Sequence, residues 1–233
     1  MTDFYVGTSG WAYNWNLENS LDWYVKESGQ NAIELNMSYY RFPFQNMVDS
    51  WAKKGKSLAW IIKVHRSITH FGKLGEETYS IFNSFKKLFL PLEEKIHYYL
   101  FQLPPKFTNI ETVEKFIEEC GNEKIAVEFR NISMFTDEII KWGKKQKILL
   151  VSVDAPKLPT TIMSEKIIYE RIHGRINWYS YNYRKDELQE IKERILSCDP
   201  KNVYVFFNNN HAMLENGRAM FNLLKSIPDG RNK

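Results

Sequence analysis

The sequence is poor in cysteine. Cys120 and Cys198 are its only two among 233 residues, and they stand far apart in no metal-binding spacing, which fits a reducing compartment. No apolar run approaches the ~18 residues that a membrane span needs. The first residues do not combine a basic segment with a long apolar stretch, so we expect no secretory signal, no membrane span and a cytoplasmic location.

Strong net charge and the common nucleotide motifs are also lacking. The 32 basic and 28 acidic residues give a net charge of +4, which alone indicates neither nucleic acid nor a membrane surface. GxGxxG, GxxxxGK[ST] and GxSxG do not occur, so the signatures of a dinucleotide fold, a P-loop and a nucleophile elbow are absent. Neither HExxH nor HxH occurs, and we expect no metal and no other cofactor.

The composition is that of a globular protein. Hydrophobic residues make up 43% of the chain and charged residues 26%, close to the average for soluble domains. We expect a single domain over residues 1–233, because two domains would be small at this length. Aromatic residues reach 15%, more than a core of this size requires, so they either pack or offer stacking faces to a ligand.

Short apolar or β-branched runs alternate with longer amphipathic segments along the chain. This alternation predicts a parallel sheet with helices between its strands, and eight runs match the count of a (β/α)₈ barrel. The expected strands are 4–8, 32–36, 58–63, 97–102, 125–129, 148–153, 167–172 and 203–207.

Helical periodicity marks several connecting segments. Apolar residues repeat every three or four positions over 79–92, and Thr108 and Glu111 have capping-box spacing before a helix through Cys120. Further helices are expected around 188–195 and over 213–224. Residues 155–166 carry two prolines and no helical stripe. We therefore predict a compact, irregular α/β barrel of the TIM type, in which the helix between strands six and seven is missing.

Polar residues gather where the expected strands end, which is where TIM barrels place their sites. Residues two apart on a strand share a face, so five strands are expected to aim polar pairs into the barrel mouth. Buried ion pairs among them would alternatively serve only to fill the barrel. The pairs are Glu34 with Asn36, Lys63 with His65, Glu128 with Arg130, Ser152 with Asp154, and Arg171 with His173.

Cations outnumber acids among these residues and their neighbours, which predicts a small anionic substrate bearing phosphate or carboxylate. We expect Glu34 or Glu128 to act as general acid/base, with His173 or His70 as partner, in a hydrolysis reaction. The expected substrate-binding residues are Lys63, Arg130, Arg171 and Arg41 for the anion, Asn36, Gln102 and Asn208 for hydroxyls or carbonyls, and Trp11 and Tyr40 for stacking.

Other functions stay open at this point. A metal-dependent phosphoesterase would recruit the carboxylates and imidazoles of the mouth, although the interleaved cations would repel a divalent ion unless a phosphate intervened. A non-catalytic barrel would bind a ligand or nucleic acid, and residues 179–184 hold three tyrosines and an arginine that could stack bases. A glycosidase would need two carboxylates at a defined separation. The tyrosines over 179–183 would alternatively form a lid.

The ordered strand-end motifs are specific as a set. They are GTSGWAY at 7–13, ELN at 34–36, YRFP at 40–43, Lys63 with ITH at 68–70, QLPP at 102–105, EFR at 128–130, RIHG at 171–174 and FNN at 207–209. As a set they resemble the YecE-like family, also called domain of unknown function 72, over nearly the whole chain. The resemblance implies a TIM-type barrel with its site at these motifs and implies no particular reaction. Asn131 and Met134 stand where the family pattern has His and Trp.

Overall fold

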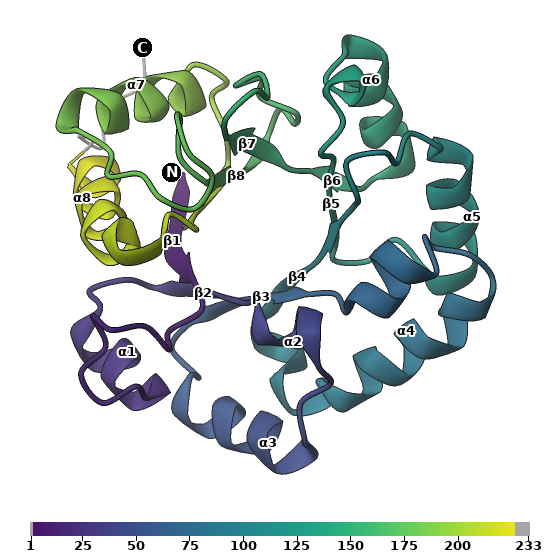
Figure 1. Cartoon of the computed structure of the whole chain (residues 1–233), viewed down its shortest axis with the longest axis horizontal. Helices are drawn as coiled ribbons and strands as arrows, with labels where there is room; N and C mark the ends of the chain where they lie inside the picture. Colours follow the sequence, from purple (N-terminus) through teal and green to yellow (C-terminus); the bar gives the residue numbers. More distant parts are fainter. Residues whose placement is uncertain (1, 227–233) are drawn as a thin grey trace.

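The computed structural model describes residues 2–226 and forms a parallel β-barrel surrounded by helices (Figure 1). The strands lie in the order β6-β5-β4-β3-β2-β1-β9-β8-β7. The first and last strands of this order, β6 and β7, are separated in the chain by Val151 alone, so the sheet closes into a barrel. The backbone N–H of Val151 donates to Val127 O at 2.9 Å, so β6 and β7 are two halves of one barrel strand. The predicted eight-stranded TIM-type barrel is confirmed. The strands are β1 (Asp3–Ser9), β2 (Ala32–Leu35), β3 (Ala59–Lys63), β4 (Ile96–Gln102), β5 (Ile125–Glu128), β6 (Leu149–Leu150), β7 (Ser152–Asp154), β8 (Ile167–Ile172) and β9 (Asn202–Phe207).

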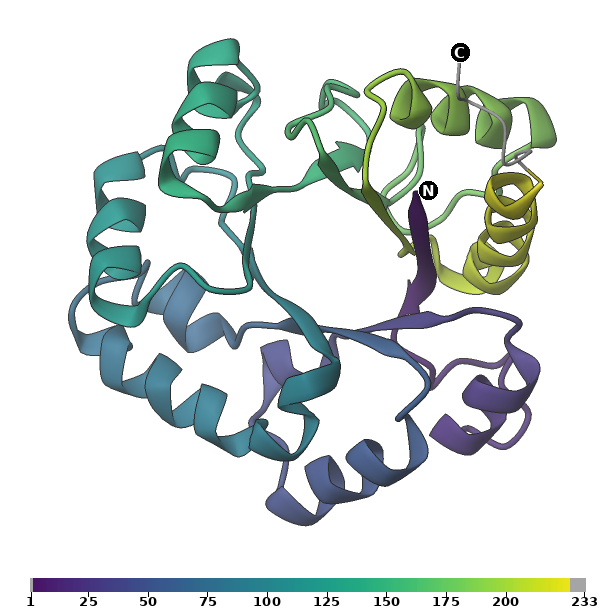
Figure 2. The ribbon, with the colours of Figure 1, turned by 180° about the vertical axis from the view of Figure 1, so that it is seen from behind.

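Amphipathic helices ring the outside of this sheet in both views (Figures 1 and 2). Their apolar faces pack on the outward side chains of the strands, as the helical stripes predict. The helices are α1 (Leu21–Glu27), α2 (Met37–Tyr40), α3 (Gln45–Lys54), α4 (Glu77–Leu88), α5 (Ile110–Cys120), α6 (Asp137–Gln146), α7 (Lys185–Leu196) and α8 (Met213–Lys225), with short turns of other helical types at Ser67–Phe71, Leu90–Lys95, Ile132–Met134 and Asn210–Ala212.

The predicted gap in the helical ring is present. Residues 155–166 contain no helix, and in Figure 1 this green loop lies between α6 and α7. Ser164 Oγ accepts from the N–H of Leu150 at 3.2 Å and donates to the carbonyl of Leu150 at 3.1 Å. Ser152 Oγ accepts from the N–H of Met163 at 2.9 Å. The hydroxyls of Ser152 and Ser164 thus supply hydrogen bonds between the loop 155–166 and the strand made of β6 and β7.

The start of α5 differs from the predicted capping box by one residue. Asn109, not Thr108, is the N-cap, and its side chain accepts from the N–H of Thr112 at 3.2 Å. Asn and Thr caps satisfy the same free N–H groups, so the neighbouring Asn could replace the threonine without changing the helix.

The barrel interior changes from aromatic to charged along its axis. At the amino end Tyr5 stacks on Tyr204 with ring centroids 4.8 Å apart, and His97 Nδ1 lies 2.8 Å from the Tyr204 hydroxyl. In the middle, a Cβ on Gly7 would lie 2.2 Å from Ala32 O and 2.9 Å from the Phe206 ring, so only glycine fits there. Many of the surplus aromatics are therefore core residues, and the polar layer sits at the carboxyl end.

The helices are too short or too polar to span a membrane. Within residues 2–226 no helix combines the length and apolarity needed to cross a bilayer. The cytoplasmic location stays a prediction.

Candidate functional site

Alternation along the strands places most of the predicted polar pairs on the inner face. Ala32, Ile61, Ala126 and Tyr169 belong to the interior cluster. The residues two positions further along each strand, which are Glu34, Lys63, Glu128 and Arg171, therefore share that face.

Ser152 and Asp154 are the exception, and the prediction that they face the mouth was wrong. Leu149 and Val151 fill the interior from this strand, which turns Ser152 and Asp154 outward. Asp154 accepts from the Tyr183 hydroxyl at 2.6 Å and from Arg175 Nη2 at 3.3 Å. Both partners belong to the segment between β8 and α7, and their hydrogen bonds hold the Asp154 side chain on the outer face of the strand.

Glu170 belongs to the same outer network and is fully buried. Arg194 Nη2 donates to one of its oxygens at 2.9 Å, while the other oxygen has no partner among the described residues. Burial raises the pKa of Glu170 to about 7, aided by the charge of Asp154 and opposed by Arg194.

We expect Glu170→Gln to flatten the dependence of stability on pH. Between about pH 4.5 and 7 the folded wild type retains a proton on Glu170 that the unfolded chain loses, so this group lowers the free energy of unfolding as pH rises. The Gln variant lacks that component, which is on the order of 3 kcal/mol. Urea unfolding at several pH values measures it, with the exposed Glu165→Gln as control. An equal slope in wild type and Glu170→Gln would contradict the assignment.

Glu34 lies in the polar layer of the barrel with every hydrogen-bonding position of its carboxylate occupied. Arg171 binds it through two bonds, from Nε at 2.8 Å and Nη2 at 2.6 Å. The hydroxyls of Ser9 and Tyr169 donate at 2.6 Å each. Burial alone would raise the pKa of Glu34, but Arg171 and these hydroxyls outweigh it and lower the pKa. Glu34 is therefore an ionised, fully buried acceptor.

Glu128 is held in a similar way on the opposite side of Arg171. One oxygen accepts from Arg171 Nη1, and the other pairs with Arg130 and accepts from Gln102 Nε2 at 3.0 Å. The two arginines outweigh burial and hold the pKa of Glu128 well below its usual value. Glu34, Arg171 and Glu128 thus form a charged layer with no exposed surface, which we call the sealed triad.

His173 is fully buried beside the sealed triad. Arg130 Nη2 lies 3.1 Å from His173 Nε2, and since a guanidinium only donates, Nε2 is the acceptor and the proton is on Nδ1. Burial and Arg130 lower the pKa of His173 well below the ordinary value. His173 is therefore neutral and orients Arg130.

Above the sealed triad the carboxyl ends of the strands surround a cavity of ≈ 1030 Å³, at the large end of the range of ligand sites. Seven predicted site residues line it: Asn36, Tyr40, Lys63, His70, Gln102, Arg130 and Asn208. The lining contains basic, aromatic and amide side chains and not one aspartate or glutamate among the described residues.

Six other predicted site residues lie outside the cavity lining. Glu34, Glu128, Arg171 and His173 are buried beneath it. Trp11 packs edge-on against Trp51 with centroids 5.7 Å apart. Arg41 is exposed, with its Nε 3.3 Å from the Met37 sulfur.

Sequence reasoning missed several residues that do line the cavity. Trp178 is the most prominent, since its ring stacks on Arg130 with the guanidinium carbon 4.5 Å from the centroid. Tyr179 lines the cavity too, whereas Tyr181 and Tyr183 bind Glu187 and Asp154 outside it. The aromatic segment after β8 was the available signal, but its spacing did not show which rings turn inward. The remaining lining residues, none of them among the thirteen predicted site residues, are Tyr13, Tyr39, Leu103, Pro105, Asn131, Ile132, Pro156, Lys157, Leu158 and Asn210.

Two titratable groups of the lining have shifted pKa values. Lys63 is 7% exposed, and burial together with the charge of Arg171 lowers its pKa to about 7, against the opposing carboxylates. Burial, then the charges of Lys63 and Arg130, lowers the pKa of His70. The lining therefore combines the basic side chains of Arg130 and Lys157 with two groups, Lys63 and His70, whose lowered pKa values favour proton exchange.

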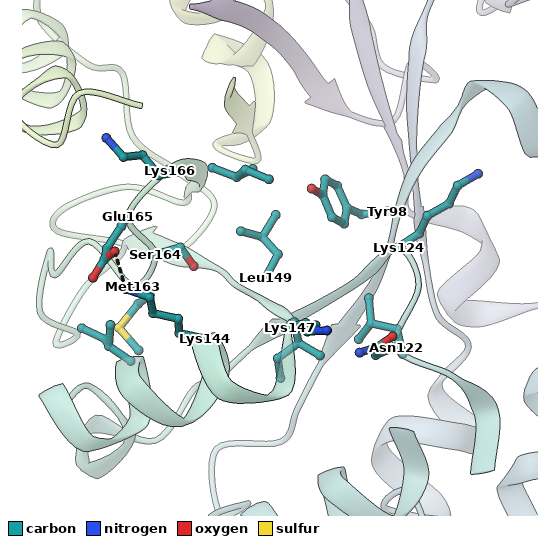
Figure 3. A pocket seen from close by; sticks show the side chains of 14 residues that line it. Tyr98, Asn122, Lys124, Lys144, Lys147, Leu149, Met163, Ser164, Glu165 and Lys166 are labelled. Carbon is teal, nitrogen blue, oxygen red and sulfur yellow. Dashed lines mark hydrogen bonds and ion pairs between the residues drawn. The ribbon is translucent and has the colours of Figure 1, made fainter. Parts of the chain in front are cut away.

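A second cavity, of ≈ 310 Å³, opens at the amino ends of β5, β6 and β8, beside the gap in the helical ring (Figure 3). Leu149, Tyr98 and Met163 give it an apolar lining. Lys144, on its edge, pairs with Glu165 at 2.9 Å, the dashed contact in Figure 3. It lacks the strand-end polar groups of the mouth, so we take the mouth cavity as the candidate functional site.

The carboxylates and imidazoles of the barrel do not gather into a metal centre. Across the described range 2–226, no group of three or more His, Cys, Asp or Glu side chains has an arrangement that could hold a metal ion.

Comparison with known proteins agrees with this fold. Crystal structures of two DUF72 family proteins, from Enterococcus faecalis V583 and Thermotoga maritima MSB8, match with TM-scores of 0.83 and 0.82 and identities of 22% and 27%. The first match covers 97% of both chains, and the second 96% of this chain and 100% of the other. The SacUVDE structure shares only the fold, with a TM-score of 0.53 and 7% identity over 97% of this chain and all of that one.

No curated protein matches the sequence significantly. A family model described as "Protein of unknown function DUF72" matches residues 5–230, nearly the whole chain, as the strand-end motifs imply. The chain belongs to the DUF72 family.

Proposed function

We propose that the mouth cavity binds a small anionic molecule bearing a phosphate or carboxylate group. The observation that carries the proposal is the composition of the lining, where Arg130 supplies a cation beside the basic groups of Lys63 and His70 and no carboxylate of the described residues is present. Among the acids of the polar layer, Glu34 pairs with Arg171, and Glu128 pairs with both Arg171 and the Nε side of Arg130. Neither carboxylate lines the cavity, so a ligand would meet the free edge of Arg130 without a carboxylate beside it. An anion entering the cavity would meet the guanidinium of Arg130 in a partly desolvated setting, where ion pairs are stronger than in water.

Arg130 is the residue best placed to bind the anion. Glu128 pairs with its Nε, His173 accepts from its Nη2 and Trp178 packs on its plane. Within residues 2–226, Nη1 makes no hydrogen bond, which leaves a donor for a ligand oxygen. An arginine fixed on three sides loses little rotamer freedom on binding, which favours affinity.

Amide groups around the cavity indicate that the ligand also carries hydroxyl or amine donors. Asn36 Nδ2 reaches Ser9 O at 3.4 Å, while the buried Asn36 Oδ1 has no partner among the described residues. A buried acceptor without a partner is costly, and a ligand hydroxyl would satisfy it. Asn208 lines the cavity as well and offers a further amide.

The acid/base roles expected for Glu34 and Glu128 do not suit the positions of their carboxylates. Both groups have low pKa values and no free position facing the cavity, so a role in filling and orienting the barrel suits them better. Any proton transfer in a hydrolysis would instead fall to His70, which lines the cavity. The hydrolysis expected from the sequence stays a prediction.

The test is a calorimetric titration with inorganic phosphate, pyrophosphate, simple phosphate esters and dicarboxylates. We expect at least one anion to bind and Arg130→Met to raise its Kd at least about tenfold, since losing a charge-assisted hydrogen bond costs about 1.5–3 kcal/mol. The matched control is Arg41→Met, an arginine outside the cavity, which should bind like wild type. Equal Kd values for the two variants, or no binding by any anion, would contradict the proposal.

A short oligonucleotide is a further arm of this titration. A nucleic-acid site would give an affinity that falls steeply with salt, in proportion to the number of phosphates contacted. For the proposed small-molecule site we expect binding of a mononucleotide or phosphate ester to be as tight as that of the oligonucleotide. Much tighter, steeply salt-dependent binding of the longer strand would favour nucleic acid instead.

A further inference from the structure

Lys63 has an environment that anion binding alone does not explain. It ends β3 on the inner face and lines the mouth cavity, yet only 7% of the residue is exposed. Among residues 2–226 its amine has no carboxylate partner, because Glu34 and Glu128 are already paired within the sealed triad. A buried ammonium without a counter-charge is unfavourable, so the site favours the neutral amine.

The amino group of Lys63 lies against the ring of Tyr39, a contact that favours the ammonium and so partly opposes the effect of burial. Lys63 Nζ lies 4.3 Å from the Tyr39 ring centroid, and Ser38 Oγ donates to the Lys63 carbonyl at 2.6 Å. The backbone and the end of the side chain are thus both held by the segment that follows β2. The amine is fixed at the edge of a cavity instead of being free in solvent like a surface lysine.

We infer that Lys63 is a nucleophile that forms an imine with a carbonyl group of the ligand, while Arg130 binds the ligand's anionic group. The substrate class is then an aldehyde or ketone bearing a carboxylate or phosphate, such as a 2-oxo acid or a sugar phosphate in its open form. This inference rests on the proposed anion site and names the substrate class and the covalent chemistry of that site.

The covalent step is balanced without a further reactant. The Nζ lone pair attacks the carbonyl carbon, the carbonyl oxygen gains a proton to give a carbinolamine, and that hydroxyl then leaves as water when the C=N bond forms. The two protons that the nitrogen loses pass through a base in the cavity to this oxygen, which carries both of them away in the released water. His70 lines the same cavity, and its pKa, lowered by burial and by Lys63 and Arg130, leaves it available as the acceptor.

Charges on all sides of Lys63 support an amine that reacts near neutral pH. Burial is the largest influence, Arg171 and Arg130 also favour loss of its proton, and Glu34 and Glu128 oppose it; together they lower the pKa to about 7. A surface lysine has a pKa of about 10.4 and is almost entirely protonated at pH 7. Lys63 should therefore be trapped by a carbonyl reagent well before other lysines.

The experiment is reductive trapping of the intact protein at pH 7 with sodium cyanoborohydride and either glyoxylate or dihydroxyacetone phosphate. Mass spectrometry of the intact chain and of its peptides locates the adduct. We expect one adduct per chain at Lys63, formed at least about tenfold faster than at any other lysine, since about a thousandth of an ordinary lysine is neutral at pH 7. Lys53→Met, which removes an exposed lysine of α3 outside the cavity, should leave that adduct unchanged, and Lys63→Arg should abolish it.

Peptide mapping of the wild type keeps the test valid even if Lys63→Arg folds poorly. Adducts spread evenly over surface lysines, or no enrichment at Lys63 with either reagent, would overturn the inference. The titration with inorganic phosphate separates the two proposals, because phosphate has no carbonyl group. Phosphate binding that depends on Arg130 without trapping at Lys63 would overturn the imine alone, whereas absence of both would overturn the anion site too.

Discussion

Arg171→Met is expected to be the most destabilising single change in the polar layer of the barrel. The substitution leaves the carboxylates of Glu34 and Glu128 buried after loss of their shared counter-charge. Breaking a buried pair by removing one partner costs ~3–5 kcal/mol. For a chain of this length that lowers the melting temperature by about 6–20 °C, which calorimetry or circular dichroism measures.

A charge-free version of the same layer is the matched control. Combining Arg171→Met with Glu34→Gln and Glu128→Gln removes all three charges of the sealed triad, and a neutral layer of similar size can be as stable as a charged one. We expect the triple variant to recover part of the stability lost in Arg171→Met. A cost below about 1 kcal/mol for Arg171→Met, the level of an exposed ion pair, would show that the triad is not sealed.

Gly174→Ala is expected to have the largest effect on ligand binding without altering a lining side chain. Gly174 has φ +111°, a conformation that L side chains rarely adopt, and a Cβ there would lie 2.5 Å from Asn177 O. Its N–H donates to the Tyr183 hydroxyl at 3.0 Å, which also holds the backbone in place here. Such strain costs ~1–3 kcal/mol and is relieved only by shifting the segment that carries Trp178, which packs on Arg130.

The ligand found by titration provides the readout for Gly174→Ala. We expect the Kd of that ligand to rise at least about tenfold. A displaced Trp178 no longer packs on the Arg130 guanidinium, which then has more conformational freedom to lose when the ligand binds. Gly121→Ala is the matched control. That glycine, which follows α5, also has positive φ, but nothing lies within 4 Å of the position that an added Cβ would occupy. Unchanged affinity in Gly174→Ala would mean that the segment after β8 does not shape the site.

Much of the fold could be predicted from periodicity alone. The run 167–172 has the same bounds as β8, and the prolines of 155–166 correctly predicted a missing helix. The division of this strand into β6 and β7 at Val151 could not be predicted, because it depends on the packing of the strand against the loop 155–166, where other strands pack against a helix. The start of α5 shifted from Thr108 to Asn109 since adjacent residues were equally able to cap it.

The site could be predicted less completely, for a physical reason. Side-chain alternation shows which residues face inward, as for Glu34 and Arg171, but not how deep they lie or what binds them. The bidentate pairing of Arg171 with Glu34 decides that both are sealed, and it depends on residues 137 positions apart in the chain. Asp154 follows the alternation too, but the inner face of its strand is the one that carries Leu149 and Val151, and the sequence did not show which of the two faces points inward.

The most direct test of the account is a crystal structure of the protein soaked in tungstate, an anomalous scatterer that resembles phosphate. The central claim is that the cavity above the sealed triad binds anions through Arg130. The account predicts a tungsten peak in the mouth cavity, with a tungstate oxygen within hydrogen-bond distance of Arg130 Nη1, that is lost in Arg130→Met. A peak only elsewhere on the chain, or an unchanged peak in the variant, would contradict it.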